Sequence, residues 1–193
     1  RYVAGDTRID RRVTLGGGRS IRWADVVRTL FRAPNSRGAL WVQYRGDRGP
    51  VARVKTYDAA AGAGGSVESP LSLRDSATAD TERDDLTIVG VPGGGTAARR
   101  VNAGIVNVGQ IPATFRVNVR LRDGRRIGGV YEEGLAEDES AQVTDVEQRL
   151  GVSIDENSTL HVTMIAGTCV AYASIVESDG DNYLIAGVRS PKP

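Results

Sequence analysis

Three acidic side chains near the C-terminus are of a type that could bind a metal ion. Glu177, Asp179 and Asp181 belong to the loop sequence Glu-Ser-Asp-Gly-Asp-Asn, in which carboxylates cluster around a glycine. Hard cations such as Ca²⁺ take oxygen ligands of this kind. The spacing differs from the Asp-x-Asp-x-Asp-Gly order of an EF-hand loop, so these residues also fit a solvated turn between two strands. A calcium loop and a solvated turn both stay open, and we expect no other cofactor.

His161 is the only histidine in the chain, and a Ser-His-Asp catalytic triad would have to include it. The chain contains no Gly-x-Ser-x-Gly sequence, which marks the nucleophile of many hydrolases. His161 stands between Leu160 and Val162, which is typical of an outward-facing position on a strand. An acidic run within residues 132–139 could supply paired carboxylates for glycoside hydrolysis, but it fits a solvated turn before a helix better. The sequence therefore predicts no catalytic residue.

The strongest structural signal is the stretch Thr159–Glu177, where two runs rich in aliphatic residues flank a short turn at Ala166–Thr168. This pattern predicts a β-hairpin at the centre of a packed sheet. Ala39–Tyr44 and Val51–Tyr57 predict an earlier hairpin of the same kind. Thr114–Leu121 alternates apolar and polar residues with the period of a half-exposed antiparallel strand. Short strands and turns recur at regular spacing, so we expect a mainly β chain built from antiparallel β-sandwiches.

An internal repeat with an offset of 120 residues runs through these patterns. The residues of the first copy that have a counterpart are Leu15, Trp23, Asp25, Val26, Leu30, Leu40 and Val42, and their counterparts are Leu135, Val143, Asp145, Val146, Leu150, Leu160 and Val162. We expect two tandem copies of one unit, each with one short helix. The first helix is predicted at Ile21–Arg32 after the cap Ser20, and the second at Val143–Leu150, with Asp145 near its cap and Gly151 as its stop.

The repeat predicts a first sandwich in residues 1–73, a linker in residues 74–83 and a second, complete sandwich in residues 84–193. The linker holds almost no apolar side chain beyond alanine. The strands expected at Leu86–Val91 and Val101–Val108 have no counterpart in the first copy. A sandwich without them would have open strand edges and an open core. We therefore expect a fragment, a processed product or a partly observed protein, or a first copy that borrows its strands from a partner.

The charge is divided unevenly over the 193 residues. Residues 1–58 carry 13 Lys and Arg against 5 Asp and Glu, whereas the rest of the chain carries 12 against 19. A basic segment can bind an anionic partner such as a nucleic acid or a polysaccharide, but the two halves could equally attract each other. The aromatic residues do not alternate with the arginines as stacking platforms would, so we expect no nucleic-acid partner.

Two further features limit the class of protein. No apolar run approaches the ~20 residues that a transmembrane helix needs. The single cysteine, Cys169, excludes an internal disulfide and is expected to be a small buried side chain.

Three motifs resemble a repeat of secreted bacterial proteins. They are Arg100–Asn107 (RVNAGIVN), Pro112–Thr114 (PAT) and Ala171–Glu177 (AYASIVE), the last followed by Gly180-Asp181. Repeats of this family are immunoglobulin-like sandwiches that occur in tandem and often accompany exported peptidases or adhesive proteins. The resemblance covers most of the second copy and, more weakly, the first. It implies export and an immunoglobulin-like fold, and it implies no catalytic residues.

These patterns together favour a non-enzymatic extracellular module, structural, adhesive or interacting, of a secreted or surface bacterial protein. Its partner would be a protein, a cell surface or a polysaccharide. Two alternatives remain. The chain could be an accessory sandwich of a larger exported hydrolase, a peptidase or glycosidase, or it could be a subunit that assembles by strand addition at the open edges of the first copy.

Overall fold

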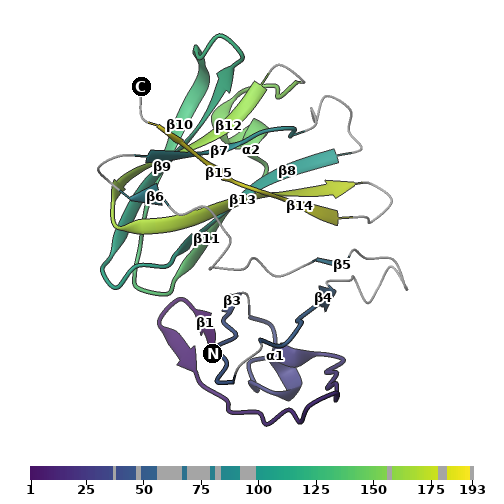
Figure 1. Ribbon diagram of the computed structural model, residues 1–193. Coiled ribbons are helices and arrows are strands. Elements are labelled where there is room, and N and C mark those ends of the chain that lie inside the picture. The colour runs from purple at the N-terminus through teal and green to yellow at the C-terminus, as the bar shows by residue number, and fades with distance from the viewer. Residues whose placement is uncertain are drawn as a thin grey trace.

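The described part of the protein is mainly β, with antiparallel sheets and two short helices (Figure 1). This confirms the predicted mainly β class, whereas the arrangement as two tandem immunoglobulin-like sandwiches stays a prediction. Neither helix has the length and apolar composition needed to cross a membrane, within the residues that are described. The computed structural model describes residues 1–36, 38–46, 49–55, 67–68, 79–80, 84–91, 99–155, 158–177 and 182–191.

Most of the chain after residue 78 forms a sandwich of two antiparallel sheets. The first, called the β12 sheet, has the strand order β10-β9-β12-β7-β15. Its strands are β7 (Asp84–Ile88), β9 (Ala113–Leu121), β10 (Arg126–Leu135), β12 (Ser158–Ala166) and β15 (Val188–Pro191). The second, called the β13 sheet, has the order β11-β8-β13-β14, and β6 also pairs with β13. Its strands are β6 (Ala79–Asp80), β8 (Arg99–Asn107), β11 (Ser140–Val143), β13 (Thr168–Glu177) and β14 (Asn182–Ala186).

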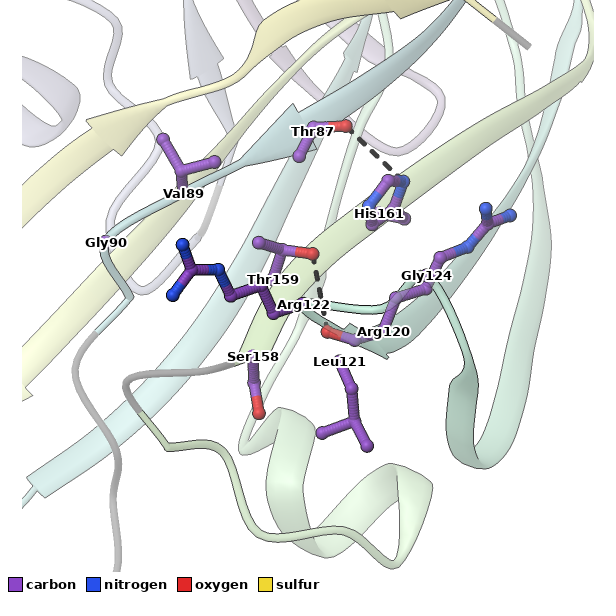
Figure 2. Close-up of a pocket in the computed structure, with 10 residues that line it drawn as sticks. All are labelled: Thr87, Val89, Gly90, Arg120, Leu121, Arg122, Gly124, Ser158, Thr159 and His161. Carbon is purple, nitrogen blue, oxygen red and sulfur yellow. Dashed lines mark hydrogen bonds between the residues drawn. The ribbon is translucent and has the colours of Figure 1, made fainter. Parts of the chain in front are cut away.

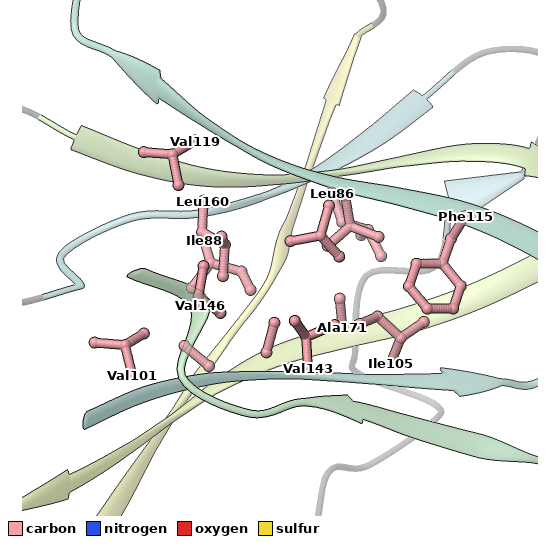
Figure 3. Close-up of a cluster of buried hydrophobic side chains, with 14 of the residues drawn as sticks. Leu86, Ile88, Val101, Ile105, Phe115, Val119, Val143, Val146, Leu160 and Ala171 are labelled. Carbon is pink, nitrogen blue, oxygen red and sulfur yellow. The ribbon is translucent and has the colours of Figure 1, made fainter. Parts of the chain in front are cut away.

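One hydrophobic core lies between the two sheets, and Figure 3 shows side chains of both pointing into it. The predicted alternation in β9 is confirmed, because Phe115 and Val117 are buried whereas Arg116 between them is exposed. Ile105 of β8 and Ala171 of β13 face them from the other sheet. Burial of apolar surface at about 25 cal/mol per Å² is the main force that holds such layers together.

β12 and β13 do not form the hairpin that the sequence predicts. β12 pairs with β7 and β9, whereas β13 pairs with β6, β8 and β14, so the two strands belong to opposite sheets. The chain crosses between the sheets at Gly167, where φ is +74°. A Cβ there would lie 2.7 Å from the Cα of Ala113, so the crossing requires glycine. Two apolar runs around a tight turn fit a hairpin and a crossing equally, because both arrangements bury both strands.

The first 55 residues form a smaller unit around a three-stranded sheet of order β2-β1-β3. Tyr2 and Val3 of β1 are buried, and the Tyr2 ring lies 5.6 Å from the ring of Phe31. The predicted hairpin between Ala39–Tyr44 and Val51–Tyr57 is wrong where the chain is described, since Ala39 and Leu40 pair with β1 instead and are half-buried there. The strands are β1 (Tyr2–Ala4), β2 (Thr7–Ile9), β3 (Ala39–Leu40) and the separate pair β4 (Val54–Lys55) and β5 (Val67–Glu68).

The two helices differ in how well the sequence predicts them. α2 (Val146–Leu150) has Asp145 as its N-cap and Gly151 in the left-handed conformation at its C-cap, as expected. α1 (Val26–Thr29) is much shorter than the predicted helix and begins after Asp25 rather than Ser20. The Asp25 side chain accepts the backbone N–H of Arg28, and this cap fixes the start of the helix.

Polar contacts join the first unit to the loop between β10 and β11. Arg1 Nη1 lies 2.5 Å from Asp138 Oδ2, and the Trp41 indole N–H donates to the Asp138 carbonyl at 3.3 Å. Arg8 donates to the Glu137 carbonyl. Basic residues of the first unit thus meet part of the acidic run.

The predicted division of the chain at residues 73 and 84 stays a prediction. β6 lies inside the predicted linker, where Asp80 pairs with Thr168 and Ala79 with Cys169 of β13. Part of that segment therefore adds a short strand to the β13 sheet.

Candidate functional site

Of the three residues predicted to bind calcium, only Glu177 lies in the described part of the chain. Its carboxylate accepts from Nε of Arg99 at 2.8 and 2.9 Å, across the register pair that joins β13 to β8. Asp179 and Asp181 lie outside the described residues. No group of three metal-ligating side chains occurs within the described ranges. The calcium loop stays a prediction, and any ligand role of Glu177 would compete with its ion pair to Arg99.

His161 lies on the outer face of the β12 sheet, in a row that crosses three strands. It pairs in register with Asn118 of β9 on one side and with Thr87 of β7 on the other. Its Nδ1 lies 3.4 Å from the Thr87 hydroxyl, which in turn lies 2.8 Å from the Ser190 hydroxyl. Burial is the main cause that lowers the pKa of His161, and the charge of Arg120 lowers it further, whereas Asp85 raises it. The imidazole is therefore held in its neutral form near pH 7.

A pocket of about 450 Å³ opens beside His161, at the end of the sheet where β9 finishes (Figure 2). Three strand ends and the turn after β9 form it. In Figure 2, Thr159 and His161 lie between the two arginine side chains. The lining residues are Thr87, Val89, Gly90, Arg120, Leu121, Arg122, Gly124, Ser158, Thr159 and His161.

The pocket has positive charge without an internal counterion. None of its lining residues is acidic, and neither Arg120 nor Arg122 makes an ion pair within the described residues. Arg120 Nε donates a long hydrogen bond of 3.4 Å to Asn118 Oδ1. Such a site has the chemistry to hold a negatively charged group.

Asp85 lies on β7, two residues before Thr87, which is the register partner of His161. Asp85 is only 3% exposed. Its Oδ2 accepts from the Thr163 hydroxyl at 3.2 Å, but its Oδ1 has no hydrogen-bond partner among the described residues. The His161 ring nitrogen is bonded to Thr87 and not to this carboxylate. A Ser-His-Asp relay requires the carboxylate to orient the imidazole, so this row does not form a triad.

Cys169 is buried in the sandwich core, and its burial raises the pKa of the thiol to about 12. A thiol with this pKa is protonated at neutral pH and is a poor nucleophile. This confirms the sequence interpretation of Cys169 as a buried side chain.

A second candidate site is the set of exposed apolar side chains of the first unit, which we call the uncovered face. Val42 is 62% exposed, whereas Val162, 120 positions later, is fully buried. Leu15 and Leu135 differ in the same way, at 44% and 3%. The exposed large apolar residues of the first unit are Val13, Leu15, Ile21, Trp23, Val42, Tyr44, Val51 and Val54.

Sequence reasoning missed the pocket because its residues come from three strands that are far apart in the chain. The signal was present in β9, where Arg120 occupies a polar position of the alternating pattern and Arg122 continues the same period beyond the strand. Only the strand order brings these arginines beside His161. The sequence did indicate correctly that His161 points outward.

No protein-family model matches the chain, and no curated protein matches it. Among solved structures, the chain is similar to the crystal structure of Thermotoga maritima 1070, with 15% sequence identity and a TM-score of 0.35. The match covers 56% of this chain and 90% of that one. The likeness is too distant to transfer a function.

Proposed function

We propose that the chain is a non-enzymatic interaction module, in which the uncovered face of the first unit binds β-strands supplied by polypeptide outside residues 1–193. The observation that carries this proposal is the contrast between Val42 and Val162, which are 62% exposed and fully buried at positions that the predicted repeat would match. An exposed apolar face of this kind marks a surface that another element covers.

The strand order supports the same proposal. In the β12 sheet, β12 lies between β9 and β7. In the first unit, β3 pairs with β1, and no strand among the described residues pairs with its other edge. A strand of the β7 pattern would fit that edge, and a strand of the β8 pattern would cover the face. Added strands bind through backbone hydrogen bonds, and their alternate side chains fill apolar pockets.

The chemistry of the second unit favours binding over catalysis. The Cys169 thiol is held protonated by a pKa of about 12, and the His161 imidazole is bonded to a threonine instead of a carboxylate. We propose, on the sequence resemblance alone, that the module works outside a bacterial cell as part of a secreted or surface protein.

A peptide of residues 84–108, which contains β7 and β8, tests the proposal when it is added to the full chain. The chain has two tryptophans, and Trp23 is 38% exposed on the uncovered face. Strand binding should bury Trp23 and shift the tryptophan emission to shorter wavelength in a saturable way. A peptide of the same composition in scrambled order should have no effect.

Val42→Asp should abolish this binding, because a charge would lie at the centre of the new interface. Val188→Asp is the matched control, since Val188 is 50% exposed on β15 of the second unit and should not affect binding. A peptide that leaves the emission unchanged, or that binds the Val42→Asp chain as well as the original, would overturn the proposal.

A further inference from the structure

We infer that the pocket beside His161 binds an oxyanion, the sulfate, phosphate or carboxylate group of a ligand, between Arg120, Arg122 and His161. This site lies on the second unit and is independent of the proposed strand binding at the first.

The sheet register brings the polar groups to one face. Arg120 pairs with Thr159, and His161 pairs with Thr87. Side chains that are directly opposite on neighbouring strands point to the same side of a sheet, as do those two residues apart on one strand. Arg120, Thr159, His161 and Thr87 therefore share the outer face. In Figure 2 the Arg122 side chain reaches toward Gly90, whereas the Arg120 side chain extends past His161 on the other side.

The charges around the pocket favour an anion. Two carboxylates flank these residues along the chain: Asp85 accepts from Thr163 and raises the pKa of His161, and Asp123 lies 3.9 Å from Arg125. A guanidinium group presents paired N–H donors that match two oxygens of a sulfate, phosphate or carboxylate group. A bound anion would relieve the repulsion that Arg120 exerts on a protonated His161. The imidazolium could then donate to the same oxyanion.

The single histidine makes a direct test available, because its NMR signals need no separation from others. The pKa of His161 is measured in the full chain with increasing sodium sulfate, while sodium chloride holds the ionic strength constant. Sulfate keeps its charge over this pH range. We expect the pKa of His161 to rise with sulfate and to level off, by about 1, which is the effect of an opposite charge within about 4–6 Å.

Arg120→Gln with Arg122→Gln should abolish the sulfate response while the chain stays folded. Arg19→Gln with Arg22→Gln removes the same two charges from the exposed surface of the first unit and should leave the response intact. A His161 pKa that rises without levelling off, or that rises equally in the double variant, would mean general screening and would overturn the inference.

Titrations with acetate and with inorganic phosphate distinguish which type of oxyanion the pocket binds. A stronger response to acetate would assign the pocket to carboxylate groups. A stronger response to sulfate or phosphate would assign it to tetrahedral groups.

Discussion

Asp25 and Asp145, which lie 120 positions apart, cap the two helices through the same side-chain hydrogen bond, although the backbone is extended at Asp25 and left-handed at Asp145. Asp25 Oδ1 accepts the backbone N–H of Arg28 at 2.9 Å, and Asp145 Oδ1 accepts that of Gln148 at 3.1 Å. The helices behind these caps differ in their surroundings. α2 places Val146 and Leu150 in the core, whereas no residue of α1 is buried.

Asp145→Ala should lower the free energy of unfolding by about 1 kcal/mol or more, because the cap is lost and alanine fits the left-handed φ of +51° at this position poorly. Asp25→Ala should have a much smaller effect on global unfolding, since α1 contributes nothing to a core. Urea unfolding followed by circular dichroism measures both. Asp145→Asn keeps the cap and tolerates the left-handed conformation, so it should stay near the original stability. Equal losses for Asp25→Ala and Asp145→Ala would contradict this account.

The sandwich formed after residue 78 was largely predictable because its strands alternate strongly. The pattern Phe115, Val117, Val119 has one arrangement that buries all three, and the structure adopts it. The turn at Gly167 was not predictable, because strands on both sides are apolar enough to serve either sheet. The long helix expected after Ser20 failed for a related reason. Of its apolar residues Phe31 is buried against Tyr2, whereas Trp23 stays 38% exposed, and periodicity alone does not hold a short helix.

The pocket could not be predicted because its charge depends on which strands are neighbours. Arg120 and His161 are 41 positions apart and meet only because β9 pairs with β12. The sequence did place His161 on an outer face, since polar residues alternate with Leu160 and Val162. The calcium loop fails in a different way. The acidic composition around Glu177 predicts a metal ligand, but composition does not show that this carboxylate is already paired with Arg99.

Gly104→Ala should destabilise the sandwich by about 1–3 kcal/mol, because a Cβ at this position would lie 2.0 Å from Cζ of Tyr172. Gly104 and Tyr172 are direct partners across β8 and β13, and the ring covers the glycine. In a Tyr172→Ala background the same change should be neutral or slightly stabilising, since the obstacle is gone. Unfolding measurements on the two single variants and the double variant give this coupling. Additive effects would show that the ring moves aside without cost.

Asp85→Asn should raise the free energy of unfolding by about 1 kcal/mol, because it removes a buried charge whose Oδ1 has no hydrogen-bond partner among the described residues. The amide oxygen can still accept from Thr163. Loss of the negative charge should also lower the pKa of His161 further, since Asp85 raises it. Asp6→Asn, at an exposed turn, is the control and should change neither quantity. A less stable Asp85→Asn variant would show that the carboxylate is needed as a charge.

His161 should make the protein less stable as the pH falls below about 6.5. Burial and Arg120 lower its pKa in the folded state from the ordinary value of 6.5, so the unfolded chain binds the proton more readily. The free energy of unfolding should therefore have its full value above pH 6.5 and should decrease as the pH falls toward the pKa of His161 in the folded state. Most carboxylates titrate near pH 4, so the range from about 5.5 to 7.5 isolates the histidine.

His161→Gln should remove this pH dependence, because glutamine keeps a polar side chain at the position and does not titrate. Urea unfolding of both proteins at several pH values across the range measures the difference. Saturating sulfate should also reduce the dependence in the original chain, because a bound oxyanion raises the folded pKa of His161 toward that of the unfolded chain. An equally steep pH dependence in the His161→Gln variant would assign the effect to other groups and would contradict the burial of this imidazole as its cause.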